Sequence, residues 1–221
     1  MRPVYLCSPK RHPDAIPLPM IHFEIVADRL EYQGCDTLMF TSKQAVLSAE
    51  AIDPGWKRLP ALAIGPATAR QIESLGGKVL HRPEHFYGEV LAEDLRRLFA
   101  DRKILYLRPR EISFDSRSYL EKAGIELKEQ ILYETKCRSY EASDAPSPGA
   151  VIVFTSPSTI HCFLKNFSWD ASYTAVVIGK ATLKHLPQGA KSVIAEVPTI
   201  DACMVQALHV AKSEEKSSNT L

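Results

Sequence analysis

The chain has 221 residues, which is enough for one large domain or for two domains of about 110 residues each. Hydrophobic residues make up 45% of it, so it can bury substantial cores. With 27 basic and 26 acidic residues the formal net charge is only +1, which argues against a nucleic-acid-binding protein, since such proteins usually carry a basic excess. The N-terminal MRPVYLCSPK lacks the apolar stretch of a signal peptide, and no run long enough to cross a membrane follows.

The cysteines are odd in number, widely scattered and without a CxxC pair. Such a pattern is typical of reduced thiols in a cytoplasmic protein. We therefore expect all five to be free. They are Cys7, Cys35, Cys137, Cys162 and Cys203.

Strand and helix signals alternate along the chain, as in a parallel sheet covered by helices. The N-terminus predicts two short strands, 4–6 and 21–24, with the proline-containing SPKRHPD between them a poor helix former. The next segment predicts strands at 37–41, 61–64, 78–81, 103–107 and 127–134, with helices at 43–52, 67–75, 87–99 and near 115–123. The last segment predicts strands at 150–154, 174–178 and 192–195, with helices at 157–165, 181–186 and 201–212.

Two motifs occur twice at the same separation. Phe-Thr-Ser follows an apolar run at 40–42 and again at 154–156, and 154 − 40 = 114. Ala-Ile-Gly-Pro-Ala-Thr at 63–68 returns as Val-Ile-Gly-Lys-Ala-Thr at 177–182, and 179 − 65 = 114. Repeats of this kind indicate duplicated architecture. We predict two similar α/β lobes, each a parallel sheet flanked by helices, with the function in a cleft between them.

The second copy lacks a counterpart of residues 103–134 at its C-terminal end. The N-terminus supplies one, because VYL at 4–6 matches LYL at 105–107 and IHFE at 21–24 matches ILYE at 131–134. We therefore predict a discontinuous domain, 1–24 plus 136–221, and an inserted domain, 26–134. The chain would cross between them twice, near 22–26 and 133–137, through a two-stranded connector.

The order of FTSxxAV, IGxATA, YGEVLAEDL, LYLRPRE and ILYET resembles the uroporphyrinogen-III synthase family over roughly residues 1–210. The resemblance implies two α/β lobes joined by a two-stranded connector. It also implies a lyase that closes the linear tetrapyrrole hydroxymethylbilane into uroporphyrinogen III, with loss of water and inversion of the last pyrrole ring through a spiro intermediate. No metal or organic cofactor is implied.

Further implications concern partners and location. The substrate is a small molecule, and neither nucleic acid nor membrane is a partner. The resemblance is consistent with a cytoplasmic monomer that meets the preceding enzyme of its pathway transiently.

Ligands of parallel sheets lie beyond the carboxyl ends of the strands, where helix N-termini offer free N–H groups to carboxylates. Four turns here have that position, and we expect them to bind the substrate's carboxylates. The alternative for each hydroxyl is a role as a helix cap alone, in line with the usual capping preferences. The residues are Thr41, Ser42, Gly65, Thr68, Thr155, Ser156, Gly179 and Thr182.

Tyr133 is the candidate proton donor, because the resemblance places the family's catalytic tyrosine at this crossing and a neutral phenol can protonate a leaving hydroxyl. On the residues alone, a packing tyrosine like its repeat mate Phe23 is the commoner outcome. Arg108 follows a strand at its carboxyl end and could pair with a substrate carboxylate. The sequence departs from the family where a basic residue is usual and Gln44 stands instead.

Two other classes remain open. One is a non-catalytic two-lobed module that binds a polycarboxylate, and the other is an α/β interaction protein with a degenerate site. Tyr133 beside the threonine turns favours the enzyme, since a receptor needs no proton donor there.

Overall fold

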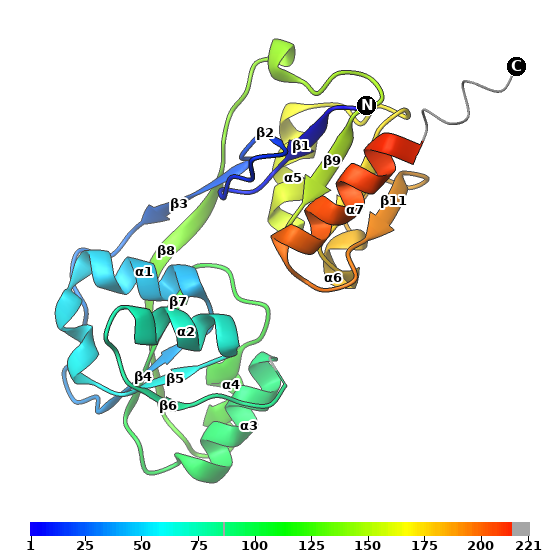
Figure 1. The fold of residues 1–221 in the computed structure, drawn as a ribbon. Coiled ribbons are helices and arrows are strands. Elements are labelled where there is room, and N and C mark those ends of the chain that lie inside the picture. Colours follow the sequence, from blue (N-terminus) through cyan, green and yellow to red (C-terminus); the bar gives the residue numbers. More distant parts are fainter. Residues whose placement is uncertain (86, 214–221) are drawn as a thin grey trace, which may run out of the picture. The chain divides into compact units, whose positions relative to one another are not determined.

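The computed structural model describes residues 1–85 and 87–213 (Figure 1). It consists of two compact units. The inserted unit is Phe23–Thr135, and the discontinuous unit combines Met1–His22 with the chain from Lys136 onward. Mixed α/β structure with parallel sheets flanked by helices confirms the predicted fold class. None of the helices in the described residues combines the length and apolarity needed to span a bilayer.

The inserted unit is built on a six-stranded sheet of order β3-β8-β7-β4-β5-β6. From β8 to β6 all pairs are parallel. β3 runs antiparallel to β8, since Val26 N donates to Leu132 O while Arg138 N donates to Met20 O. The strands are β3 (Ile21–Ile25), β4 (Thr37–Phe40), β5 (Ala61–Ala63), β6 (Val79–His81), β7 (Ile104–Pro109) and β8 (Leu127–Cys137).

Helices cover both faces of this sheet. Successive side chains of β4 point to opposite faces of the sheet. Leu38 and Phe40 belong to the core under α1 and α2, and Met39 belongs to the core under α3 and α4. The helices are α1 (Lys43–Ile52), α2 (Pro66–Ser74), α3 (Gly88–Leu98) and α4 (Ser116–Glu121), with a 3₁₀ turn η1 (Pro54–Arg58).

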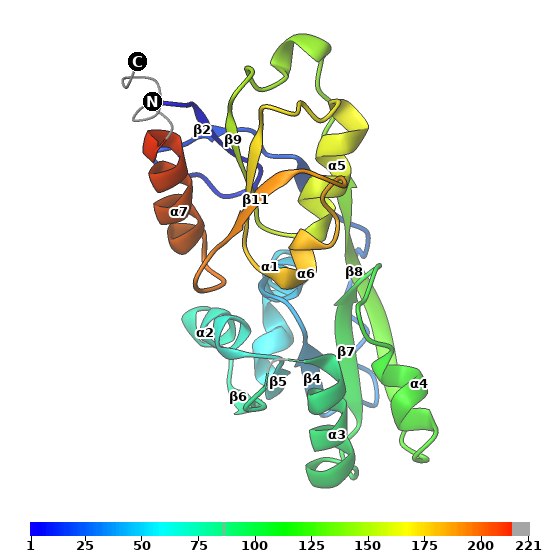
Figure 2. The ribbon, with the colours of Figure 1, turned by 90° about the vertical axis from the view of Figure 1, so that its right-hand side faces the viewer.

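The discontinuous unit has a five-stranded parallel sheet of order β11-β10-β9-β1-β2. Ile152 and Phe154 of β9 pack on the side of α5, and Val151 and Val153 pack on the side of α7. Figure 2 shows α5 and α7 on opposite sides of the strands. The strands are β1 (Val4–Leu6), β2 (Ile16–Pro17), β9 (Val151–Phe154), β10 (Thr174–Val177) and β11 (Lys191–Ile194), and the helices are α5 (Pro157–Asn166), α6 (Lys180–Leu183) and α7 (Ile200–Ser213), with a 3₁₀ turn η2 (Ala142–Asp144).

The two sheets repeat one strand order. β6-β5-β4-β7-β8 in the inserted unit corresponds to β11-β10-β9-β1-β2 in the discontinuous one. In each, the strand that ends in the Phe of the Phe-Thr-Ser motif is central: the two strands that follow it in the chain lie on one side, and β7 and β8, or β1 and β2, lie on the other. This reversal creates a topological switch point, between β4 and β7 in one unit and between β9 and β1 in the other. Such points are where open α/β sheets bind ligands.

Most predicted elements match the observed ones within a few residues, with two differences. A short strand, β2, follows the proline-rich segment where the inserted unit has α4 and β8. The predicted helix 181–186 is a single turn, α6, because Pro187 follows closely and prevents its extension.

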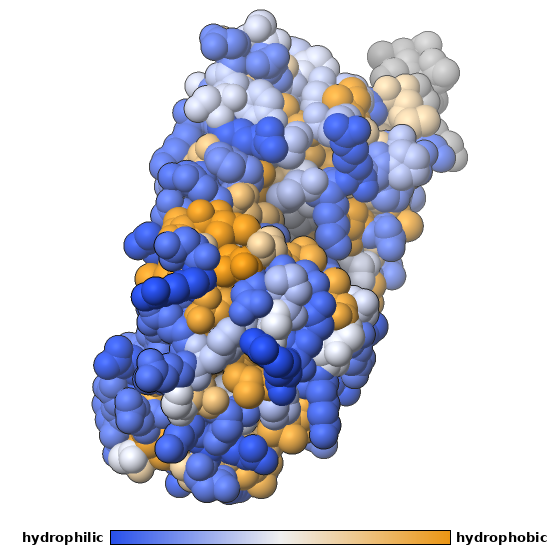
Figure 3. Space-filling view, turned by 90° about the vertical axis from the view of Figure 1, so that its left-hand side faces the viewer, coloured by the Kyte–Doolittle hydropathy of each residue, from blue (hydrophilic) through white to orange (hydrophobic). Residues whose placement is uncertain are grey.

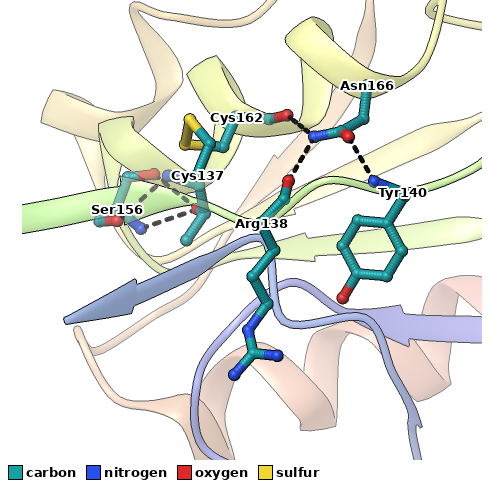
Figure 4. Close-up of a disulfide and its surroundings, with 7 residues drawn as sticks. Cys137, Arg138, Tyr140, Ser156, Cys162 and Asn166 are labelled. Atoms are coloured by element: carbon teal, nitrogen blue, oxygen red, sulfur yellow. Dashed lines mark hydrogen bonds between the residues drawn. A yellow bond between two sulfur atoms is a disulfide. The ribbon is translucent and has the colours of Figure 1, made fainter. Parts of the chain in front are cut away.

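The expectation that all cysteines are free is wrong for two of them. Cys137, the last residue of β8, forms a disulfide with Cys162 of α5, 25 residues along the chain (Figure 4). Asn166 lies at the end of the same helix; it donates to the carbonyl of Arg138 and accepts from Tyr140 N, so the chain after the bridge is tied to α5 by two hydrogen bonds. Spacing gave no signal, since the pairing depends on where a strand end meets a helix. Cys7, Cys35 and Cys203 are free, as predicted.

Candidate active site

A pocket of about 240 Å³ lies at the switch point of the inserted unit. Its wall includes Thr41 and Ser42 from the end of β4, Tyr106 from β7, and the loop that follows β7. The other lining residues are Ile64, Gly88, Pro109, Glu111, Ile112, Ser113, Phe114 and Ser116. Glu111 is the one charged residue among these lining residues, and the others are apolar or carry hydroxyl groups.

Two tyrosine–hydroxyl pairs occupy the end of β4. Thr41 Oγ1 lies 2.7 Å from Tyr106 Oη, and Ser42 Oγ lies 2.9 Å from Tyr133 Oη. Tyr106 belongs to the core under α3 and α4, whereas Tyr133 belongs to the core under α1 and α2. The adjacent Thr41 and Ser42 therefore reach phenols on opposite faces of the sheet.

Both phenols are protonated at neutral pH. Burial raises the pKa of Tyr106 to about 12, although its hydrogen bond with Thr41 opposes the shift. Burial also raises the pKa of Tyr133, and the hydrogen bond with Ser42 lowers it by a smaller amount. Phe23 meets the Tyr133 ring edge-on, with 5.6 Å between centroids, and so fixes the ring. Each phenol can therefore donate a proton or a hydrogen bond.

Ser42 has a second role as the N-cap of α1. Its extended backbone ends β4, and its Oγ accepts from Ala45 N at 3.0 Å. The prediction of Ser42 as a helix cap is confirmed. Gly65 holds the same position for α2 with Pro66 directly after it, and Thr68 is buried in the first turn. Both helix N-termini lie at the carboxyl end of the sheet, where free N–H groups attract anions.

Arg108 lies within the inserted unit. Its Nε is 3.2 Å from Glu129 Oε2, and Nη1 donates to the carbonyls of Pro109 and Arg110, each at 3.0 Å. Both side chains of the ion pair are largely buried. Arg108 thus supports the loop that forms one wall of the pocket, and its direct pairing with a substrate carboxylate stays a prediction.

In the discontinuous unit the predicted turns follow neighbouring strands. Thr155 and Ser156 follow β9, and Gly179 and Thr182 follow β10, which pairs with β9 in register. Ser156 caps α5, with Thr159 completing a capping box. Thr182 is buried, but its helix has only four residues, so the partial charge of a helix N-terminus is small there.

Sequence reasoning missed Tyr106 and Glu129. A tyrosine inside the apolar run ILYL is expected to be an ordinary core residue. Its hydrogen bond with Thr41 is apparent only when β7 is placed beside β4. Glu129 lies in an alternating strand, where a charged residue reads as solvent-facing. Strand adjacency was the missing information in both cases. Hydrophilic residues cover most of the face that Figure 3 shows, with hydrophobic residues gathered among them.

A profile of the family described as "Uroporphyrinogen-III synthase HemD" matches residues 10–204. The chain belongs to the uroporphyrinogen-III synthase family. The match takes in both units and every predicted site residue, so the resemblance noted from the motifs is confirmed.

Solved structures share this fold. The uroporphyrinogen-III synthetase of Helicobacter pylori is 28% identical, with a TM-score of 0.81 over 95% of this chain and 100% of the other. A mutant uroporphyrinogen III synthase of Thermus thermophilus shares the fold at 14% identity, with a TM-score of 0.58 over 97% of this chain and 100% of the other. No curated protein sequence matches the chain significantly.

Proposed function

We propose that this protein is a uroporphyrinogen-III synthase, a lyase that converts hydroxymethylbilane into uroporphyrinogen III. The terminal hydroxyl leaves as water, the last pyrrole ring is inverted through a spiro intermediate, and the macrocycle closes. Family membership supports the assignment. The observation that carries it is the hydrogen bond between Ser42, which lines the pocket, and the buried Tyr133, which does not, at the carboxyl end of the sheet.

Tyr133 is proposed as the general acid. Departure of hydroxide from a carbon is costly at neutral pH, so a donor that delivers a proton to the oxygen lowers the barrier. The phenol is protonated at neutral pH, as an ordinary tyrosine is, and the ring is held by the edge-on contact with Phe23 and the hydrogen bond with Ser42. A rigid donor loses little entropy when the substrate arrives.

The turns are proposed to hold the substrate's carboxylates. A chain with a net charge of +1 cannot rely on a basic surface for a polyanion, whereas the N–H groups at α1, α2 and α5 bind carboxylates without side-chain charge. Thr41, Thr68 and Thr155 add hydroxyl donors there, and Gly179 with Thr182 adds a weaker turn. Arg108 is proposed to act on the same carboxylates through the loop that it supports.

Holding a flexible bilane folded is the larger part of the task. The substrate closes without help to the unwanted isomer, so the enzyme must favour one closure over another, and positioning supplies that preference. The chemistry needs no electron acceptor, and we propose a cofactor-independent enzyme. We further propose a cytoplasmic monomer that meets the preceding enzyme transiently. The disulfide removes one argument for a reducing compartment, so the location rests on the family alone.

The test is incubation with freshly made hydroxymethylbilane and separation of the product isomers. We expect the type III isomer in the presence of the protein and the type I isomer in its absence. Type I isomer alone, together with saturable binding of the bilane, would instead indicate a binding module. Absence of both binding and type III product would indicate a degenerate site.

A further inference from the structure

We propose that Ser42 is a positioning residue that acts through Tyr133: its hydroxyl donates to the phenol oxygen, aims the phenol's proton at the leaving hydroxyl, and stabilises the phenolate that remains. The inference rests on the proposed function. It concerns a residue otherwise explained as a helix cap.

The hydrogen bonds of Ser42 suit this role. Its Oγ accepts from Ala45 N at 3.0 Å and lies 2.9 Å from Tyr133 Oη. The cap uses one lone pair and leaves the hydroxyl hydrogen available. Among the described residues, Ser42 is the hydrogen-bond partner of the Tyr133 hydroxyl. When Tyr133 donates to substrate, the Ser42–Tyr133 bond persists only with Ser42 as the donor.

Burial makes that bond matter most after proton transfer. The Tyr133 side chain is almost fully enclosed, with 4% of its surface exposed. A phenolate without a donor in such a place is costly, because a buried charge loses its hydration. Ser42 supplies the donor, and the N-terminus of the ten-residue α1 adds a favourable partial charge beside it. Hydrogen bonds to charged groups are stronger than neutral ones, so the contribution grows as the proton leaves.

The repeat provides a matched control. Ser156 stands 114 residues after Ser42 in the same Phe-Thr-Ser motif and caps α5 by accepting from Thr159 N. In the described part of the chain no tyrosine hydroxyl bonds to it. Loss of its hydroxyl therefore removes a cap without removing a tyrosine partner.

The experiment is a double-mutant cycle under single-turnover conditions with saturating enzyme. The variants are Ser42→Ala, Tyr133→Phe and the double variant, and Ser156→Ala is combined with Tyr133→Phe in the same way. We expect Ser42→Ala to slow type III formation about tenfold, the loss typical of a hydrogen bond to a charged group. In the Tyr133→Phe background the same change should have no further effect. Ser156→Ala should instead change the rate by the same factor in the wild-type protein and in the Tyr133→Phe variant.

Two further variants separate the hydroxyl from the cap. Ser42→Thr keeps both and should retain most of the rate. Ser42→Gly keeps good capping but lacks the hydroxyl, so it should be as slow as Ser42→Ala even if the alanine variant is unstable. A retained rate in Ser42→Gly would overturn the proposal.

The cycle also separates this inference from the proposed function. Equal factors for Ser42→Ala in both backgrounds would overturn the positioning role and leave the synthase activity intact. An unchanged rate in Tyr133→Phe would overturn both the general acid and the positioning role, again without touching the activity itself. A wild-type protein that makes no type III isomer would overturn the function.

Discussion

Reduction of the Cys137–Cys162 disulfide should destabilise the discontinuous unit. The bridge closes a loop between residues 25 apart, and the loop-entropy relation gives about 3.5 kcal/mol at 25 °C for that length. The expected loss is at most this value, since Asn166 still ties the chain after Cys137 to α5 in the reduced protein through Arg138 and Tyr140. With a urea slope of about 1–3 kcal/mol/M, the unfolding midpoint should fall by at most about 1–3.5 M.

The two tryptophans allow each unit to be followed separately. Trp169 packs in the same core as Cys162, and Trp56 is buried in the core of the inserted unit. We would measure urea unfolding by fluorescence in Trp56→Phe and Trp169→Phe variants, with and without a dithiol reductant. Reduction should lower the midpoint reported by Trp169 and leave the one reported by Trp56 unchanged. A thiol titration of the denatured, unreduced protein should count three thiols. Five thiols, or equal shifts at both tryptophans, would refute this reasoning.

Three further predictions concern the site and the units. Tyr133→Phe should slow type III formation by ~10²-fold or less and leave product affinity unchanged. The effect lies at the low end for general acids because the bilane's hydroxyl already leaves readily. An unchanged single-turnover rate would indicate that catalysis depends on positioning by the turns and not on this side-chain acid. Thr68→Ala and Thr182→Ala should weaken product binding, measured by titration, more than they lower the turnover rate at saturation. A larger effect on the rate than on binding would contradict the proposal that these residues bind the substrate's carboxylates. Residues 26–134 should unfold cooperatively in isolation, whereas 136–221 should not, because β1 is missing from its sheet; a cooperative thermal transition of 136–221 would count against this.

Local signals were sufficient for the helix that carries Ser42. A buried strand, a hydroxyl residue and the apolar spacing of KQAVLSAEAI specify β4, its cap and α1 within a few residues. The 114-residue offset then predicted the architecture, because duplicated sequence repeats the same strand order. These inferences depend only on neighbours in sequence or on self-comparison.

The site required information of another kind. The Thr41–Tyr106 and Ser42–Tyr133 pairs join residues 65 and 91 positions apart, and no single-sequence pattern specifies such distances. The disulfide was missed for the same reason. Arg108 was read as a free ligand for carboxylates because the charge of Glu129 beside it becomes apparent only when β7 and β8 are paired.

The discontinuous unit has a consequence for protein synthesis. The inserted unit is complete once the chain reaches Thr135, so it can fold while the rest is still on the ribosome. β1 and its short neighbour β2 are made before the inserted unit, but β9, which pairs with the other edge of β1, is synthesised after it. During that interval the edge of β1 that will pair with β9 has unpaired backbone groups, a condition that favours association with other nascent chains. A premature stop after the inserted unit would make this condition permanent, and we expect such truncated chains to aggregate even though half of the molecule is folded.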